Sequence, residues 1–331
     1  MILVTGGAGY IGSNMVRNLV KNGYEVVVLD NLSTGHKEAV HPDAIFIEGD
    51  LQDRESLKTV FYNHQIEAVM HFAANCYVGE SVLQPQKYYE NNVIGFIHLL
   101  NEMIEAKVTR LVFSSSCAVY GIPKQSVIDE NTEREPISPY GRTKMIAEKV
   151  IEDYSEAYGL KHCILRYFNV TGADLDGVLG EDHQPETHLI PNILQHLQGK
   201  SHAVSVYGVD YDTPDGTCIR DYIHVSDLVE AHYLSLKKIL GNPPENRVYN
   251  LGNGRGYSIK EIIQMCEKVT GKKARVIVEK RRPGDPPRLI ASIQKAVTEL
   301  KWNPKNDMQS IIQSAWDWFC KHPDGYEGEK R

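Results

Sequence analysis

Tyr140 and Lys144 stand four residues apart in a segment, residues 138–158, whose apolar spacing predicts a helix. Side chains at i and i+4 project from the same helix face. Ser138 followed by proline is typical of an N-cap and a first helical position, so Tyr140 belongs to the first turn, near the positive end of the helix dipole. A phenol has a pKa of about 10 and is not a base at neutral pH without help. The ammonium of Lys144 and the positive helix end both favour the phenolate, which can act as a base. Taken alone, this spacing more often marks an exposed surface pair.

Three consecutive serines, Ser114, Ser115 and Ser116, favour the catalytic interpretation of the Tyr140–Lys144 pair. They end an apolar run that predicts a sheet strand. Open α/β sheets bind their ligands at the carboxyl ends of the strands. A serine hydroxyl at that edge can bridge a substrate hydroxyl and the tyrosine.

A glycine-rich segment follows the first apolar run and places Gly6, Gly9 and Gly12 in a GxxGxxG pattern. Such glycines allow a tight turn and let a pyrophosphate approach the N–H groups that begin a helix. Asp30 ends the next apolar run, about 20 residues further on, where an acid binds the adenosine ribose and repels a 2′-phosphate. We therefore predict a dinucleotide site that prefers NAD to NADP; the alternative is a turn that only packs a helix on a strand. Asp50 ends the third run, where either adenine or the start of a helix would explain it.

Short apolar runs alternate with helix-spaced segments through the first half of the chain. Strands buried on both faces of a parallel sheet need such runs. The alternation predicts a doubly wound, Rossmann-like α/β fold with right-handed crossovers. Strands are expected at 2–5, 25–30, 45–47, 68–72, 111–114 and 163–167, and helices at 11–21, 54–63, 88–106 and 138–158.

Beyond about Gly172, clusters of Gly, Asp and Pro separate short helical segments. We expect residues 1–172 to form the dinucleotide domain and residues 173–331 mainly a smaller substrate-binding lobe. An apolar run at 247–252 is expected to rejoin the sheet, so the two parts interleave. Helices are expected here at 189–197, 225–236, 259–269 and 308–319.

Composition excludes several classes of function. The 331 residues carry 36 Lys and Arg against 43 Asp and Glu, a net charge of −7, which argues against a nucleic-acid binder. No apolar run reaches the roughly 18 residues that a membrane helix needs. The first residues lack the basic region and small-residue cleavage site of a secretory signal, so a secreted protein is not expected. Six cysteines without a CxxC pair are typical of reduced thiols, so a cytoplasmic protein is expected.

Eight short motifs are spread along essentially the whole chain. They are GGAGYIG at 6–12, DN at 30–31, HFAA at 71–74, SSS at 114–116, YGRTK at 140–144, RYFN at 166–169, DGTCIRDYIHV at 215–225 and RPGD at 282–285. In this order they resemble the UDP-glucose 4-epimerase family of extended short-chain dehydrogenases/reductases. The resemblance implies that a UDP-hexose is oxidised at C4 by tightly held NAD, that the keto sugar turns over, and that hydride returns to its other face.

The resemblance also implies a role for individual residues. Ser116 would hold the sugar hydroxyl, Tyr140 would be the base and Lys144 would tune it; Phe168 would lie by the nicotinamide, and backbone groups of residues 205–207 would hold uracil. The implied cofactor-binding residues are Gly6, Gly9, Tyr10, Ile11, Gly12, Asp30, Asn31, Asp50, Leu51, Phe72, Ala73, Ala74, Asn91, Tyr140, Lys144 and Phe168. The implied substrate-binding residues are Ser116, Tyr140, Asn169, His188, Leu189, Ser205, Val206, Tyr207, Arg220, Tyr222, Arg282, Asp285 and Leu289.

Three positions set this chain apart within the family pattern. Cys76 stands where many members have a lysine, and His188 where an asparagine is common. Leu289 occupies the position that closes the pocket near the sugar 2-substituent. A tyrosine there restricts members to glucose and galactose, so leucine predicts that N-acetylated sugars are accepted too. The resemblance further implies a homodimer built on the helices at 88–106 and 138–158.

Two other functions remain as alternatives. A nucleotide-sugar 4,6-dehydratase needs an acid pair beside the active serine, but Ser116 is followed by Cys-Ala-Val. A non-catalytic NAD-sensing protein would be expected to lose Tyr140 or Lys144, and both are present.

Two histidine sites have ordinary explanations. His183 and His188 lie five residues apart in a loop rich in proline and acids, and a metal site needs further matched ligands. We therefore expect a solvated or substrate-facing loop and no metal. His71 ends an apolar strand and is expected to be a hydrogen-bonded core imidazole.

Overall fold

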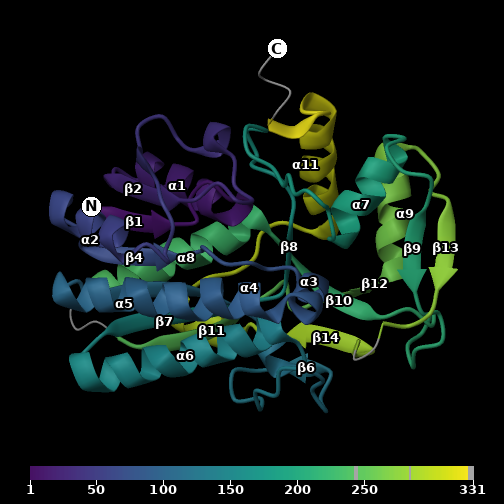
Figure 1. Ribbon diagram of the computed structural model, residues 1–331. Helices are drawn as coiled ribbons and strands as arrows, with labels where there is room; N and C mark the ends of the chain where they lie inside the picture. The colour runs from purple at the N-terminus through teal and green to yellow at the C-terminus, as the bar shows by residue number, and fades with distance from the viewer. Residues whose placement is uncertain (242–244, 283–284, 327–331) are drawn as a thin grey trace. The chain divides into compact units, whose positions relative to one another are not determined.

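The nucleotide-binding architecture predicted from the sequence is present in the computed structural model, which describes residues 1–241, 245–282 and 285–326 (Figure 1). In this part of the chain, seven strands form one sheet in the order β11-β7-β5-β4-β1-β2-β3. The pairs β1–β2, β1–β4, β2–β3 and β4–β5 are parallel. The strands are β1 (Ile2–Thr5), β2 (Val26–Asp30), β3 (Ile45–Glu48), β4 (Ala68–His71), β5 (Arg110–Ser116), β7 (Lys161–Tyr167) and β11 (Arg247–Leu251).

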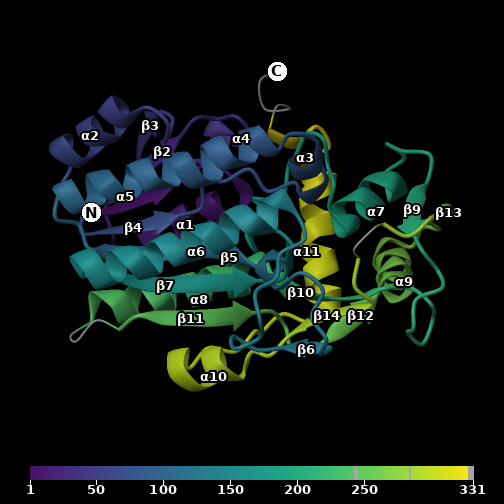
Figure 2. The same cartoon turned by 60° about the horizontal axis from the view of Figure 1, so that its bottom comes forward.

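The direction of strand addition reverses between β1 and β4, which is the switch point where such sheets bind ligands. As expected, the late strand β11 joins the sheet next to β7. Helices α2 (Arg54–Asn63), α5 (Phe96–Glu105) and α6 (Pro139–Tyr158) lie on one face, and α1 (Tyr10–Lys21) and α8 (Val225–Leu240) on the other (Figure 2).

Alternate strand residues build the core between the sheet and the α2–α5–α6 layer. Leu3, Leu29 and Leu111 are buried there against Leu99 of α5 and Ile151 of α6. Each such side chain contributes about 1.5–3 kcal/mol on burial. Through these contacts α6 packs against β5, the strand that carries the three serines.

The prediction of a single helix at 88–106 is wrong in detail. The structure has α4 (Pro85–Tyr89), a π-helical segment η2 (Glu90–Gly95) and then α5. Within η2, Asn92 donates to the carbonyl of Asn75 at 2.9 Å and to the hydroxyl of Thr143 at 3.2 Å. π-Helical turns are frequent at functional sites, and this one ties the loop after β4 to α6.

The structure divides the chain into two units whose boundaries differ from the expected one at Gly172. Unit 1 is residues 1–121, 133–166 and 229–249, and unit 2 is residues 122–132, 167–228 and 250–331. No helix in the described ranges has the length and apolar character needed to cross a membrane. Smaller elements of unit 1 are η1 (Lys37–Ala39), α3 (Val78–Leu83) and η3 (Cys117–Tyr120).

Among the described residues of unit 2, five strands form a sheet ordered β12-β10-β14-β6, with β8 paired to β10, and β9 pairs with β13 separately. The sequence did not mark these short strands. They are β6 (Val127–Ile128), β8 (Asn169–Thr171), β9 (Val204–Tyr207), β10 (Ile219–His224), β12 (Gly256–Ser258), β13 (Val276–Glu279) and β14 (Arg288–Ala291). The helices are α7 (Leu189–Leu197), α9 (Ile259–Thr270), α10 (Gln294–Leu300) and α11 (Met308–Lys321).

Candidate active site

Two glycines where β1 leads into α1 leave no room for a side chain, Gly6 in the loop and Gly12 within the helix itself. Gly6 has a φ of +74°, and a Cβ on it would lie 2.5 Å from the backbone nitrogen of Ala73. A Cβ on Gly12 would lie 2.0 Å from the carbonyl oxygen of Gly6. Gly9 is the N-cap of α1, and Tyr10 and Ile11 form the first turn. A close-packed loop opening onto a helix N-terminus fits the pyrophosphate of a dinucleotide.

The residues after β4 border this loop. The backbone N–H groups of Phe72 and Ala73 both donate to the carbonyl of Thr5, at 2.9 and 3.1 Å. The Phe72 ring packs on the imidazole of His232 with centroids 4.9 Å apart. Phe72 and Ala73 thus lie beside the end of β1, at the switch point, and a cofactor role for residues 72–74 remains a prediction.

Asp30 ends β2 and is tied to the glycine loop. Its Oδ2 accepts a hydrogen bond from the Ala8 N–H and its Oδ1 one from the Leu32 N–H, both at 2.9 Å. Burial raises the pKa of this carboxyl, which the two N–H groups oppose. Asp30 therefore shapes the loop as well as being a candidate ribose ligand, and only the second role was expected.

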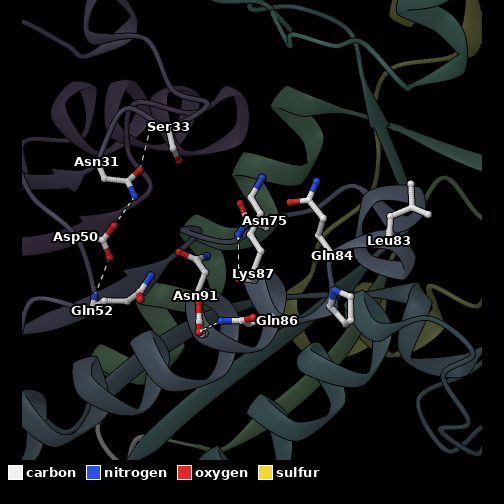
Figure 3. A pocket seen from close by; sticks show the side chains of 12 residues that line it. Asn31, Ser33, Asp50, Gln52, Asn75, Leu83, Gln84, Gln86, Lys87 and Asn91 are labelled. Atoms are coloured by element: carbon white, nitrogen blue, oxygen red, sulfur yellow. Dashed lines mark hydrogen bonds between the residues drawn. The ribbon is translucent and has the colours of Figure 1, made fainter.

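Asp50, Asn31 and Asn91 line a pocket of about 630 Å³ in unit 1 (Figure 3). The Asn31 amide donates to Asp50 Oδ2 at 2.8 Å, and the Gln52 N–H donates to Asp50 Oδ1 at 2.8 Å. The neighbouring Leu51 is buried. This polar wall suits the adenosine end of a dinucleotide, and a cofactor role for these residues remains a prediction.

The helix-capping interpretation of Asp50 is wrong. Helix α2 begins at Arg54, and Asp53 is its N-cap, accepting from the N–H groups of Glu55 and Ser56. The two aspartates are three residues apart, and the sequence alone does not say which of them starts the helix.

Tyr140 and Lys144 have the helical placement that the sequence predicts. The Ser138 hydroxyl caps α6 by accepting from the Gly141 N–H at 3.1 Å. Tyr140, in the first turn, keeps only 7% of its surface exposed. Lys144 is buried, and its ammonium donates to the Ser114 carbonyl at 2.7 Å. Burial lowers the pKa of Lys144 to about 8, so the side chain still carries its charge at neutral pH.

The three serines have separate partners. The Ser114 hydroxyl lies 3.1 Å from His232 Nε2, and the Ser115 hydroxyl donates to Glu148 Oε1 at 2.5 Å. The hydroxyls of Ser114 and Ser115 therefore both have hydrogen-bond partners within unit 1. The Ser116 hydroxyl accepts from the Ala118 N–H at 3.2 Å at the end of β5, where a ligand of an α/β sheet binds. This arrangement favours Ser116 for the substrate.

Glu148 is a supporting residue that sequence reasoning missed. Its side chain is fully buried and takes two parallel hydrogen bonds from Arg166, at 2.9 and 2.6 Å. Arg134 adds a third contact at 2.8 Å. Because Glu148 also accepts from Ser115, it fixes α6 to β5. The available signal was its position one turn after Lys144 on the same helix face.

His71 is the core imidazole that its place in the strand predicts. Its Nδ1 lies 2.7 Å from the Thr5 hydroxyl, and its ring packs on Phe96 and Phe113 at 4.8 and 5.7 Å. Burial, with a smaller effect of Lys144, holds its pKa well below the usual range. It is neutral near pH 7. Cys76 is an exposed free thiol.

In unit 2, β10 and its two neighbouring strands bring four predicted substrate residues together, and an ion pair adds a fifth. Arg220 forms an ion pair with Asp285, and it stands opposite Leu289 in the parallel β10–β14 register. On the other side of β10, Tyr222 stands opposite Asn169, whose amide donates to the Asp221 carbonyl at 2.8 Å. The strand register thus explains how residues 53 and 69 positions apart in the sequence stand opposite each other.

Phe168 and Tyr222 are both buried within unit 2. Phe168 donates its N–H to the Leu251 carbonyl at 3.0 Å, and burial raises the pKa of the Tyr222 phenol. Asp221, which the sequence did not single out, accepts the N–H groups of Asn253 and Ala291 at 2.7 and 3.1 Å. Burial raises the pKa of Asp221 to about 7.

The expected uracil segment lies in β9, which pairs with β13 from Ser205 to Tyr207. Val206 points into the core. The Arg282 guanidinium lies 4.0 Å from the centroid of the Tyr207 ring, so a phosphate-binding candidate and the uracil segment are neighbours. Residues 283–284 of the RPGD motif lie outside the described residues.

His188 immediately precedes α7, and Leu189 begins that helix. The His188 ring turns toward Glu181 and Glu186, at 2.8 and 2.9 Å. These two glutamates lie beside both histidines of this loop, and the His188 side chain is also 40% exposed to solvent. The solvated interpretation therefore does not describe its buried carboxylates.

A glycine turn at the switch point and an acid at the end of β2 are typical of Rossmann-like enzymes that use a dinucleotide. In the same unit, the tyrosine–lysine pair lies beside the strand that ends in serines. The family model described as NAD dependent epimerase/dehydratase family matches residues 2–252, and the chain belongs to this family.

Known proteins resemble the chain over nearly its full length. It is 50% identical to the UDP-glucose 4-epimerase of Halalkalibacterium halodurans, covering 100% of this chain and 98% of the relative. The solved UDP-glucose 4-epimerase of Brucella ovis in complex with NAD is 48% identical, with a TM-score of 0.93 over 96% of this chain and 98% of that one. The UDP-Glc/GlcNAc 4-epimerase of Campylobacter jejuni is 42% identical, with a TM-score of 0.85 over 97% and 99%.

Proposed function

We propose that the chain is an NAD-dependent enzyme that interconverts UDP-galactose and UDP-glucose by inverting C4 of the hexose. The observation that carries this proposal is the arrangement of Tyr140 and the Lys144 ammonium on α6 across from the serine-ended strand β5. A sequence identity of 50% to a UDP-glucose 4-epimerase over the whole chain supports the choice of reaction.

Each residue of unit 1 has a defined task in this reaction. NAD, which the glycine loop and Asp30 fit, supplies a hydride acceptor at C4 when bound. Ser116 holds the sugar 4-hydroxyl, and the Tyr140 phenolate removes its proton. The Lys144 ammonium favours that phenolate. After the keto sugar has turned over, Tyr140 returns the proton to the oxygen on C4.

The residues of unit 2 bind the nucleotide in this proposal. Arg220 and Arg282 suit the diphosphate because a guanidinium makes two parallel hydrogen bonds to it, which lysine cannot. The ion pair with Asp285 orients Arg220. Firm binding of UDP leaves the hexose free to turn over, which inversion of C4 requires.

We propose further that the chain forms a homodimer through the segments at 88–106 and 138–158 and works in the cytoplasm. The first point rests on family resemblance, and the second on six free cysteines. UDP-hexose is then its small-molecule ligand, without nucleic acid or membrane as partners.

A conversion assay separates the proposed function from its two alternatives. Purified protein is mixed with UDP-galactose without added reductant, and the products are separated. The proposal expects UDP-glucose, a 4,6-dehydratase would yield a 4-keto-6-deoxy sugar nucleotide, and an NAD-sensing protein would yield no new sugar nucleotide.

Lys144→Met is expected to move the acidic limb of the rate–pH profile to higher pH. A cation nearby lowers the pKa of a phenol, so its removal raises the Tyr140 pKa and less phenolate exists at neutral pH. The profile of kcat between pH 5.5 and 9.5 measures this. Lys149→Met, on an exposed position of the same helix, is the control and should leave the limb in place. An unmoved limb in Lys144→Met would mean that Lys144 only positions the cofactor.

Wild-type protein is expected to epimerise UDP-N-acetylglucosamine as well as UDP-glucose, and Leu289→Tyr to lose the first activity selectively. An apolar wall discriminates by about 1–3 kcal/mol, or roughly 10- to 200-fold, per methylene-sized change. The ratio of kcat/KM for the two substrates measures the effect, with Leu289→Met as a volume-conserving control. A wild type that ignores the N-acetylated sugar, or a ratio unchanged by tyrosine, would refute Leu289 as the gate.

A further inference from the structure

Four side chains of unit 2 converge in the loop between β8 and α7: Glu181, His183, Glu186 and His188. One nitrogen or oxygen of each lies within 4.8 Å of that of every other. The proposed reaction gives Glu181, His183 and Glu186 no task.

Contacts at both ends hold this loop. The Gly180 N–H donates to the Tyr326 hydroxyl at 3.0 Å, and a Cβ on Gly180 would lie 2.1 Å from the Trp318 ring. At the other end, the Asn192 amide donates to the His188 carbonyl at 2.8 Å. The described residues between β8 and α7 form neither helix nor strand, so these anchors set the geometry of the cluster.

Hydrogen bonds alone satisfy the cluster poorly. His188 Nδ1 lies 2.8 Å from Glu181 Oε1 and 2.9 Å from Glu186 Oε1, although one ring nitrogen carries at most one proton. His183 Nδ1 lies 3.3 Å from Glu181 Oε1 and 3.8 Å from Glu186 Oε2. Two nitrogens and two carboxylates thus point toward one centre.

The two carboxylates also have oxygens without hydrogen-bond partners. Both glutamate side chains are only 4% exposed, and the buried Oε2 atoms of Glu181 and Glu186 have no such partner among the described residues. A buried oxygen of this kind is costly unless something positive approaches it.

We propose that Glu181, His183, Glu186 and His188 bind one divalent transition-metal ion, with zinc preferred. Zinc bonds of about 2.0–2.2 Å in a tetrahedron separate the ligand atoms by roughly 3.3–3.6 Å. The four nitrogen–oxygen distances of 2.8–3.8 Å, two of which involve different oxygens of Glu186, lie around that value, and one atom from each residue lies within 4.8 Å of the other three. Two carboxylates with two neutral imidazoles carry a charge of −2, which a dication neutralises, and imidazole nitrogens favour zinc over magnesium or calcium.

Backbone contacts already orient one proposed ligand. The N–H groups of Thr187 and His188 both donate to Glu186 Oε1 at 2.7 Å. Outer contacts of this kind fix the direction of a metal ligand. Four protein ligands leave no open position for a reacting water, so the ion is structural: it pins the start of α7 to Glu181.

Two protons are the competing source of positive charge. Burial alone lowers the pKa of His183, but its contacts with Glu181 and Glu186 raise it to about 10. A cluster without metal is therefore a pair of imidazolium–carboxylate contacts. Zinc binding must be measured directly to separate these two states.

The test uses chelator-stripped, full-length protein titrated with zinc sulfate in a calorimeter, with magnesium chloride in a parallel titration. Wild type should bind about one zinc per chain with a Kd on the order of 1 µM or tighter, and the magnesium titration should show no binding. His183→Gln and Glu181→Gln should each weaken binding by about 100-fold or more. His202→Gln, which changes an exposed histidine outside the cluster, should bind like wild type.

A second measurement remains informative if one variant folds poorly. Zinc at 100 times its Kd should raise the Tm of wild type by about 4 °C, and this rise should vanish in Glu181→Gln. Wild type that binds no zinc, or binding unchanged in both cluster variants, would leave the proton-paired cluster as the correct state. Neither readout needs turnover, so the result is independent of the proposed function.

Discussion

Replacing Tyr140 by phenylalanine is expected to lower kcat for UDP-galactose by roughly 100- to 10,000-fold. The substitution removes only the hydroxyl that takes the substrate proton. The buried ring keeps its edge contact with Tyr88, whose centroid lies 6.5 Å away, so the fold and the NAD content should be nearly unchanged. Initial rates, bound NAD per chain and the Tm are measured on the same preparation.

Tyr158→Phe is the matched control, because Tyr158 ends the same helix and is exposed. It should retain the wild-type rate. A Tyr140→Phe protein that kept more than a tenth of the wild-type rate would remove Tyr140 from the mechanism, since a general base contributes about 100-fold or more.

Glu148→Ala is expected to destabilise the protein by about 3–5 kcal/mol. The change leaves the buried Arg166 guanidinium without the carboxylate that it contacts at 2.9 and 2.6 Å, and it also removes the acceptor of the Ser115 hydroxyl. Urea and thermal unfolding of the variant, each compared with wild type, measure the loss.

Glu152→Ala provides the comparison one helical turn further on. Its half-exposed carboxylate contacts only Arg134 among the ion pairs described, at 3.4 Å, and its loss should change stability by less than about 1 kcal/mol. Equal effects of the two substitutions would mean that Glu148 is not the residue that holds α6 to β5.

The sequence predicts those parts of the fold that depend on local pattern. Gly6 and Gly12 predict the turn because no other residue fits at either position. The neighbouring strands are recognisable in the sequence as apolar runs. Short strands such as β8 and β14 carry no such pattern, since each is defined by its partner, β10. The π-helical segment was not predicted. Its Asn92 hydrogen-bonds to Asn75 and Thr143, and both of these residues are remote from it in the sequence.

Those parts of the site could be predicted in which the spacing of residues along a helix determines their geometry. Contacts that depend on the tertiary fold could not be predicted. Tyr140 and Lys144 share a helix face whatever surrounds them. Asp30, by contrast, was expected to bind a ribose, but it also holds the Ala8 N–H, 22 residues away. The sequence spacing of His183 and His188 suggests no cluster. Only the folded loop shows that two glutamates lie beside His188.

Isotopic labelling of the sugar tests the central claim most directly. The protein is given UDP-galactose with deuterium at C4 of the hexose, in ordinary water without added reductant, and the UDP-glucose formed is examined by NMR and mass spectrometry. If hydride leaves C4 and returns to the same carbon from its other face, the product keeps its deuterium at C4. Loss of deuterium to water, or its appearance at C6, would contradict an inversion of C4 by hydride removal and return.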